Sequence, residues 1–213
     1  MSQIGMLGTG SNPQLPNNRI WIGSEGPNVF TFVNAAEVPL ILVLWLMAPY
    51  DDQASFMNAR VPAITYSLTD PGAAVQVSLA NGVPGGWAAL YNRTTTLTEY
   101  GQIDNTFGEF STGDWATIDV SRLVNMRGDP MTISVAAGRG KVGGCVADMS
   151  RCVYTCDVGA GNSCGAEGTY SLLDCVGPNA VQSADEDGNP TGGCQGWSFG
   201  GEVGVVLTRD GLV

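Results

Sequence analysis

Three observations predict a mainly β protein built as an antiparallel β-sandwich. Short apolar segments recur at intervals of roughly 8 to 12 residues, separated by Gly and Pro turns. The 213 residues include 30 Gly and 11 Pro, which favour turns over long helices. No window longer than a turn or two has a helical period of 3.6 residues. Because 44% of the residues are hydrophobic, the chain can build a sizeable core.

The strands are expected to follow one another closely along the chain. Residues 29–34 alternate between apolar and polar side chains and predict a first strand. The apolar run 38–47 predicts a second strand that is buried on both faces. Further strands are predicted at residues 61–68, 75–79, around Trp87, 97–100, 107–110, 115–120, 131–135 and 203–208.

Changes in composition divide the chain into four parts. Residues 1–27 form a polar N-terminal arm, which we expect to be disordered in isolation. Residues 28–138 form the sandwich core, 139–200 a cysteine-rich loop subdomain, and 201–213 the closing strand of the sandwich. An ordered arm would be held by its own domain or by a neighbouring subunit, so a homo-oligomer formed through residues 1–27 is one alternative.

Charge and composition exclude several classes of function. The net charge of −11 disfavours nucleic acid and anionic membrane surfaces as partners. The chain has no histidine, which excludes serine–histidine triads and H-E-x-x-H zinc sites. Residues 38–48 are too few to cross a bilayer, which needs about 20, so we expect no transmembrane segment. Residues 1–18 lack the basic and apolar regions of a secretory leader.

The cysteines predict three disulfides. All six lie in the cysteine-rich segment, and their spacing leaves fifteen pairings open. The alternative is a thiolate metal site at Cys152 and Cys156, but there is no second tight pair and no histidine, so we expect neither a metal nor a cofactor. Disulfides form in oxidising compartments, so we expect an extracellular or particle-surface location. The six residues are Cys145, Cys152, Cys156, Cys164, Cys175 and Cys194.

Several motifs resemble the central part of thaumatin-like proteins. They are G-G-W-A at 85–88, T-L-T-E-Y at 96–100, I-D-V-S at 118–121 and D-P-M at 129–131, in this order. C-V-A-D-M-S-R-C at 145–152 is similar to a segment of that family's cysteine-rich domain. The resemblance spans roughly residues 29–208 and implies a thaumatin-like sandwich, although Ala35 and Ala36 stand where that family has cysteine.

The resemblance also implies an acidic cleft that binds or hydrolyses β-1,3-glucan. Glu99 and Asp119 match two of its acids and are the candidate catalytic residues. Asn125 stands in place of an Asp and completes the candidate ligand-binding set, while Ala89 replaces an Arg. An amide cannot donate the proton, and without the Arg the cleft loses a charge that keeps carboxylates ionised. We therefore expect binding without catalysis.

The resemblance further implies the disulfide pairs Cys145–Cys194, Cys164–Cys175 and Cys152–Cys156. The first functional hypothesis is a carbohydrate-binding protein of β-glucan type, in a defence or cell-surface role. The second is a structural or assembly subunit, such as a coat, lattice or virion protein, that uses its arm to contact another protein subunit. The third is an endo-β-1,3-glucanase.

Overall fold

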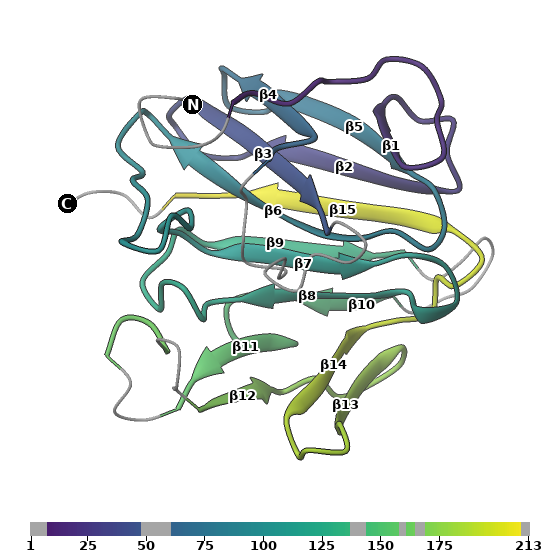
Figure 1. Ribbon diagram of the computed structural model, residues 1–213, viewed down its shortest axis with the longest axis vertical. Coiled ribbons are helices and arrows are strands. Elements are labelled where there is room, and N and C mark those ends of the chain that lie inside the picture. Colours follow the sequence, from purple (N-terminus) through teal and green to yellow (C-terminus); the bar gives the residue numbers. More distant parts are fainter. Residues whose placement is uncertain (1–7, 48–60, 137–143, 158–160, 165–168, 210–213) are drawn as a thin grey trace.

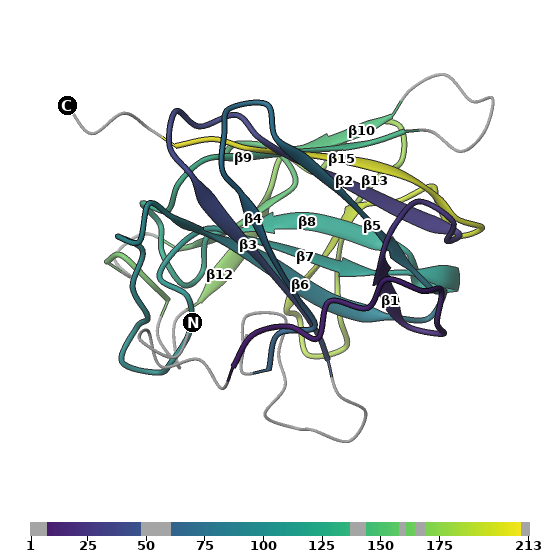
Figure 2. The same ribbon diagram turned by 90° about the horizontal axis from the view of Figure 1, so that it is seen from above.

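Two β-sheets pack face to face in the computed structural model (Figures 1 and 2). The structure describes residues 8–47, 61–136, 144–157, 161–164 and 169–209. Within these ranges the ordered elements are strands and a short 3₁₀ turn, Gly113–Trp115, so the mainly β prediction is confirmed. No helix in the described ranges is long and apolar enough to cross a bilayer.

The first sheet has six strands and covers one side of the core. In spatial order these are β1 (Ile20–Ile22), β5 (Ala74–Leu79), β2 (Asn28–Asn34), β15 (Gly201–Leu207), β9 (Met131–Val135) and β10 (Cys145–Ala147).

The second sheet has nine strands and carries the cysteine-rich segment at one edge. Its main path is β12 (Tyr170–Leu173), β11 (Val153–Cys156), β8 (Thr117–Ser121), β7 (Phe107–Ser111), β6 (Pro84–Tyr91), β3 (Leu40–Leu46) and β4 (Ile64–Leu68). The hairpin of β13 (Ala180–Ala184) and β14 (Pro190–Cys194) joins it through β8.

The sheets are mixed, so the expectation of a purely antiparallel sandwich is wrong. Strand β15 runs parallel to β2, and β11 runs parallel to β8. Parallel neighbours need a long connection between them. Here β15 returns from the end of the chain to lie beside β2 (yellow beside purple in Figure 1). The coarser prediction, that two β-sheets pack on each other, is confirmed.

The core between the sheets is built around aromatic side chains. Alternation along β2 directs Phe30 and Phe32 inward, where both are fully buried. Their rings lie 5.9 and 5.4 Å from the Trp87 ring in edge-to-face contacts. Trp87 is fully buried at the centre of this aromatic cluster.

Strand β3 is buried on both faces, as its apolar run predicted. Leu42 and Leu44 face the core between the sheets. Val43 and Trp45 face the other side, where Phe107 belongs to the same second cluster of buried side chains. An uninterrupted apolar strand is the pattern expected when both faces are covered.

The predicted strand at residues 97–100 is wrong. Leu97 makes an isolated bridge with Ile103, and a turn lies between them. The Thr98 N–H donates to the Gln102 carbonyl (2.8 Å), and the Thr98 carbonyl accepts from the Gly101 N–H (3.0 Å). These local bonds compete with strand pairing, which explains why the apparent T-L-T-E-Y strand does not form.

The described part of the arm, residues 8–27, packs on its own domain. Strand β1 pairs with β5 along one sheet edge. At the other sheet, Asn12 Nδ2 donates to the Thr65 carbonyl at 2.9 Å, and its Oδ1 accepts from the Thr65 N–H at 2.8 Å. The arm thus contacts edge strands of both sheets. Residues 1–7 lie outside the described ranges.

All six cysteines form disulfides, and the predicted pair Cys145–Cys194 is confirmed. The pairs expected for the other four are wrong, because the structure joins Cys152 to Cys175 and Cys156 to Cys164. Cys152 directly precedes β11 and Cys156 ends it, so the extended strand between them holds them too far apart to bond. The β11–β12 register pairs Val153 with Leu173, which places Cys152 beside Cys175.

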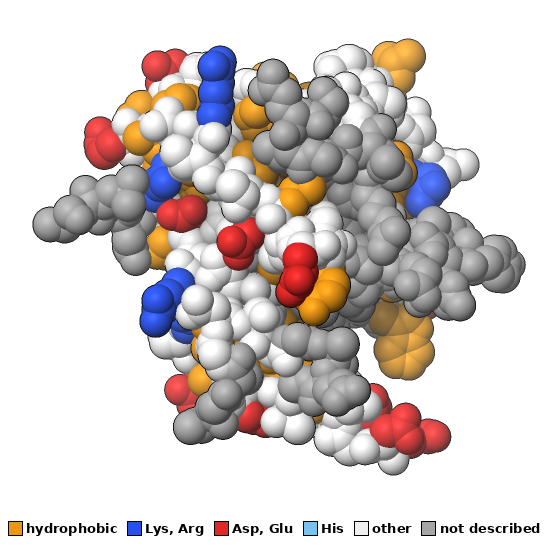
Figure 3. All heavy atoms as spheres, turned by 60° about the vertical axis from the view of Figure 1, so that its left-hand side comes forward, with side chains coloured by type: hydrophobic (Ala, Val, Ile, Leu, Met, Phe, Trp, Pro, Cys, Tyr) orange, Lys and Arg blue, Asp and Glu red, His pale blue; other side chains and the backbone are white. Residues whose placement is uncertain are grey.

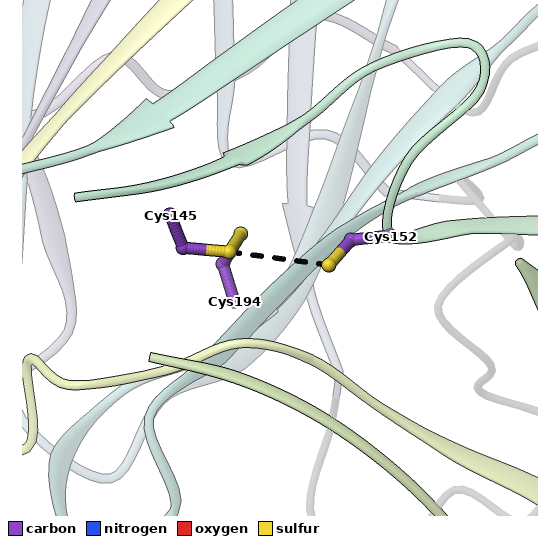
Figure 4. A group of neighbouring side chains, drawn as sticks. All are labelled: Cys145, Cys152 and Cys194. Atoms are coloured by element: carbon purple, nitrogen blue, oxygen red, sulfur yellow. Dashed lines mark hydrogen bonds between the residues drawn. A yellow bond between two sulfur atoms is a disulfide. The ribbon is translucent and has the colours of Figure 1, made fainter. Parts of the chain in front are cut away.

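Two of these disulfides lie next to each other in the interior (Figure 4). The Cys145 and Cys152 sulfur atoms, which belong to different disulfides, are 3.9 Å apart. Cys145, Cys152 and Cys194 would be spaced closely enough to ligate a metal, but all three are already bonded to sulfur. This cluster therefore offers no free thiolate to a metal ion.

Candidate acidic cavity

A cavity of about 380 Å³ lies between the outer face of the second sheet and the cysteine-rich segment. Strands β7 and β8 form its floor, β11 and β12 one wall, and β14 the other. The lining residues are Glu109, Phe110, Ser111, Thr117, Asp119, Leu123, Tyr154, Tyr170, Pro190, Thr191 and Gly192.

The floor brings two carboxyl groups together. Glu109 on β7 is paired in register with Asp119 on β8, so both side chains lie on the same face of the sheet. Their neighbours Phe110 and Ile118 belong to the main core. Alternation along each strand therefore directs the carboxyl groups away from the core and into the cavity.

Burial raises the pKa of both carboxyl groups. Desolvation raises the pKa of Glu109 to about 7, and the nearby Ser121 hydroxyl offsets part of this effect. Desolvation also raises the pKa of Asp119 well above its usual range, with a further contribution from the Glu109 charge. Glu109 Oε1 and Asp119 Oδ1 are enclosed and have no hydrogen-bond partner in the described structure. Near neutral pH the pair therefore holds a proton.

Two tyrosines form the wall contributed by β11 and β12. The Tyr154 and Tyr170 rings lie 6.0 Å apart and are tilted by 60°. The Tyr154 hydroxyl donates to the Gly192 carbonyl at 3.4 Å, which connects this wall to the β14 wall. Burial, followed by the charges of Asp119 and Glu109, raises the pKa of Tyr154, so its hydroxyl remains protonated.

The β14 wall depends on close backbone packing and on a disulfide. Gly193 has a φ of +142°, and a Cβ there would approach the Ile118 carbonyl oxygen to 2.7 Å. Glycine thus lets β14 approach β8, where Cys194 is paired with Ile118. The Cys145–Cys194 disulfide then connects β14 to β10. The cavity therefore has a cross-linked wall.

The sequence-predicted ligand residues do not all meet in this cavity. Asp119 lies on its floor. Glu99 is exposed in the turn after Leu97, outside the cavity lining. Asn125 also lies outside the lining and donates from Nδ2 to Asp104 Oδ1 at 2.9 Å.

Sequence reasoning missed Glu109. A signal was present, because F-G-E-F and I-D-V each place one acid between strand-forming residues. Glu109 and Asp119 are also equidistant from Asp114 at the centre of the intervening turn. A hairpin symmetric about that turn would have paired the two acids.

Other acidic side chains in the described ranges are exposed or partly exposed, and several have local partners. Figure 3 shows Asp and Glu scattered over one face, interspersed with Lys and Arg. Asp148 is paired with Arg151, and Asp185 caps its own turn by accepting from the Asn189 N–H at 2.8 Å. By contrast, hydrogen bonds lower the pKa of Asp148 and of Asp185.

Fold and site together define a disulfide-bonded β-sandwich with a buried acidic cavity. A family model described as the Allergen Asp f 4-like domain matches residues 24–155. The match covers more than half of the chain, so the protein belongs to this family. The expected membership of the thaumatin-like family is wrong, because its supporting motifs were short and one of them, T-L-T-E-Y, forms no strand. No curated protein matches the chain.

Proposed function

We propose that the acidic cavity binds a neutral glycan without cleaving it. The observation that supports this most directly is the pair of enclosed carboxyl oxygens, Glu109 Oε1 and Asp119 Oδ1, which have no partner in the described structure. Both carboxyl groups also line the cavity, where sugar hydroxyl groups would donate to them. The adjoining rings of Tyr154 and Tyr170 offer apolar faces for the C–H groups of a sugar ring.

Electrostatics favour a neutral ligand over an anionic one. The cavity floor carries two acids, and neither forms an ion pair with Lys or Arg in the described ranges. The protein as a whole, with a net charge of −11, would also repel an anionic polysaccharide. The β-glucan specificity depended on the thaumatin resemblance, so we propose the wider class of neutral glycans.

We place this binding outside the cell, at a cell surface or in a defence setting. Three disulfides are the support, because such bonds persist in oxidising surroundings. The alternative of an assembly subunit would use the arm to contact a neighbour. Residues 10–22 instead bond to β4 and β5 of their own domain, and for this reason we prefer glycan binding.

Calorimetric titration of Glu109→Ala, with Glu99→Ala as the matched control, tests the proposal. The probes are soluble β-1,3-glucan, chitin oligosaccharides and mannan. Loss of a charge-assisted hydrogen bond costs about 1.5–3 kcal/mol, so affinity should fall roughly 10- to 100-fold. Glu99→Ala should bind as the wild type does, because Glu99 lies outside the cavity.

A second variant, Asp119→Asn, preserves side-chain shape and guards against a folding defect in the first. Wild-type protein that binds none of these glycans would refute the proposal, and so would equal losses in the Glu109 and Glu99 variants. Reducing ends released from a bound glycan would refute binding without cleavage and favour the hydrolase alternative, in which two carboxyl groups serve as acid and as base or nucleophile.

A further inference from the structure

Trp115 differs from every other tryptophan of the chain. The four others, Trp21, Trp45, Trp87 and Trp197, are buried, whereas the Trp115 side chain is 86% exposed. A large apolar ring gains nothing from this position in the isolated protein. Tryptophan combines an apolar ring with a polar N–H and is enriched at interfaces, so its exposure makes Trp115 a candidate ligand contact.

The turn that carries Trp115 is firmly anchored. The buried Thr112 hydroxyl donates to the Ala80 carbonyl at 2.7 Å, and the Gly82 N–H donates to the Thr112 carbonyl at 3.0 Å. Gly113 has a φ of +84°, and a Cβ there would approach the Gly82 nitrogen to 2.8 Å. The turn that carries Trp115 is therefore in close contact with the turn at residues 80–82. Such an anchored turn fixes the backbone that presents the Trp115 ring, which lowers the entropic cost of binding.

The same turn continues directly from the cavity floor. Ser111 and Thr117 form the last pair of the β7–β8 ladder, and both line the cavity. Trp115 lies between them in sequence, two residues before Thr117. Gln195 donates to the Thr117 hydroxyl at 3.2 Å, which holds this end of the floor in place.

We propose that Trp115 is an outer subsite that stacks on a sugar ring of a glycan extending out of the acidic cavity, so that the ligand is a polymer. This inference rests on the proposed glycan binding and names the size class of the ligand. Trp115 lies in the 3₁₀ turn that precedes Thr117, a lining residue of the cavity, and is not itself part of the lining. A monosaccharide held at Asp119 would therefore not contact the indole, whereas a longer glycan would.

The polar surroundings of Trp115 fit a glycan better than an apolar partner. Asp114 precedes it directly in sequence, and Thr117, two residues further on, accepts a hydrogen bond from Gln195, so polar groups flank the turn that carries the indole. The C–H face of a sugar ring can lie flat on the indole while its hydroxyl groups bond to such neighbours. An exposed indole with polar groups nearby therefore suits a sugar ring, which has both an apolar C–H face and hydroxyl groups.

The test compares Trp115→Ala with Tyr100→Ala. Tyr100 is 66% exposed in the loop before β7, whereas Trp115 follows β7, so the control is an exposed aromatic at the opposite end of that strand. The probes are soluble β-1,3-glucan and the monosaccharide from which it is built, or the polymer and monosaccharide of chitin or mannan if that glycan binds. We expect Trp115→Ala to lose about 10-fold in polymer affinity and to keep its monosaccharide affinity, because one sugar ring does not reach the indole. Tyr100→Ala should match the wild type with both probes.

Fluorescence gives a second readout that does not depend on the variant. Because the other four tryptophans are buried, acrylamide should quench mainly Trp115, and saturating polymer should protect it. Unchanged polymer affinity in Trp115→Ala, or quenching that polymer does not reduce, would overturn the outer subsite while leaving binding in the cavity intact. A wild-type protein that binds no glycan would instead refute the proposed function itself.

Discussion

At the scale of single residues, the pair of Glu109 and Asp119 dominates the chemistry of the protein. The register of β7 and β8 sets two acids side by side, and desolvation raises the pKa of each. Burying an ionised carboxyl group is costly unless it is paired, so the folded state favours the protonated form. This position therefore costs stability, and it leaves one oxygen of each carboxyl group without a partner in the described structure.

Replacement of Glu109 by Gln should make stability less dependent on pH. The Glu109 pKa is raised from 4.5 to about 7, so between these values the folded state holds a proton that the unfolded state releases. The stabilisation is fully present below about pH 4.5 and is lost as pH rises through 7. Glu109→Gln should be more stable than the wild type at pH 8, by up to about 3 kcal/mol.

Urea unfolding between pH 5 and 8 measures this difference. Glu99→Gln is the control, because Glu99 is an exposed carboxyl group outside the cavity. Free energies of unfolding that change in parallel for wild type and Glu109→Gln across this range would contradict the proposed cost of burial.

At the scale of elements, strand β7 supports both the core and the cavity. Phe110 packs in the core at 5.3 Å from the Phe30 ring, while Glu109 faces the cavity. Gly108 precedes them, and the Trp87 indole occupies the space that a side chain at this position would need. The absence of a Cβ thus lets the Trp87 ring pack directly on β7.

Substitution of Gly108 by Ala should destabilise the protein by about 1–3 kcal/mol or more, because the added methyl group overlaps a fully buried ring. Gly204→Ala is the matched control, since a Cβ at this strand position would be 4.0 Å from its nearest neighbour, the Ser134 carbonyl oxygen. Thermal unfolding of both variants checks the prediction. Equal midpoints for the two variants would show that Trp87 can move aside at little cost.

At the scale of the whole molecule, segments from both ends of the chain complete the sandwich. Strand β1 adds an edge to the first sheet beside β5, and Asn12 covers part of β4 at the edge of the second. Strand β15 is inserted between β2 and β9. Exposed strand edges invite pairing with other chains, so the arm also protects against association.

Deletion of residues 1–23 should therefore destabilise the domain more than deletion of residues 1–7. The longer deletion removes the buried side chains of Ile20 and Trp21, which contribute roughly 3–6 kcal/mol together. A midpoint lower by on the order of 10 °C and association that increases with concentration are expected. Differential scanning calorimetry and light scattering measure both quantities. A large particle that becomes monomeric without the arm would instead favour the assembly alternative.

Local patterns in the sequence determined much of the secondary structure. The apolar run that became β3, the alternation of β2 and the core position of Trp87 could be predicted, because burial on one or both faces leaves a periodic pattern in the chain. The number of disulfides and the absence of histidine chemistry also followed from composition alone. Each of these properties depends on the residue itself or on its near neighbours.

Tertiary structure decided which distant residues meet. The register of β11 and β12 selected Cys152–Cys175, and the return of β15 beside β2 made the first sheet mixed. The pairing of β7 with β8 placed Glu109, and not Glu99, beside Asp119. Strand register and strand order depend on contacts summed over the whole fold, and a one-residue shift of either strand would turn its acid to the opposite face and separate the pair. The sequence therefore contains the acidic residues, but the packing of the sheets brings them together in one cavity.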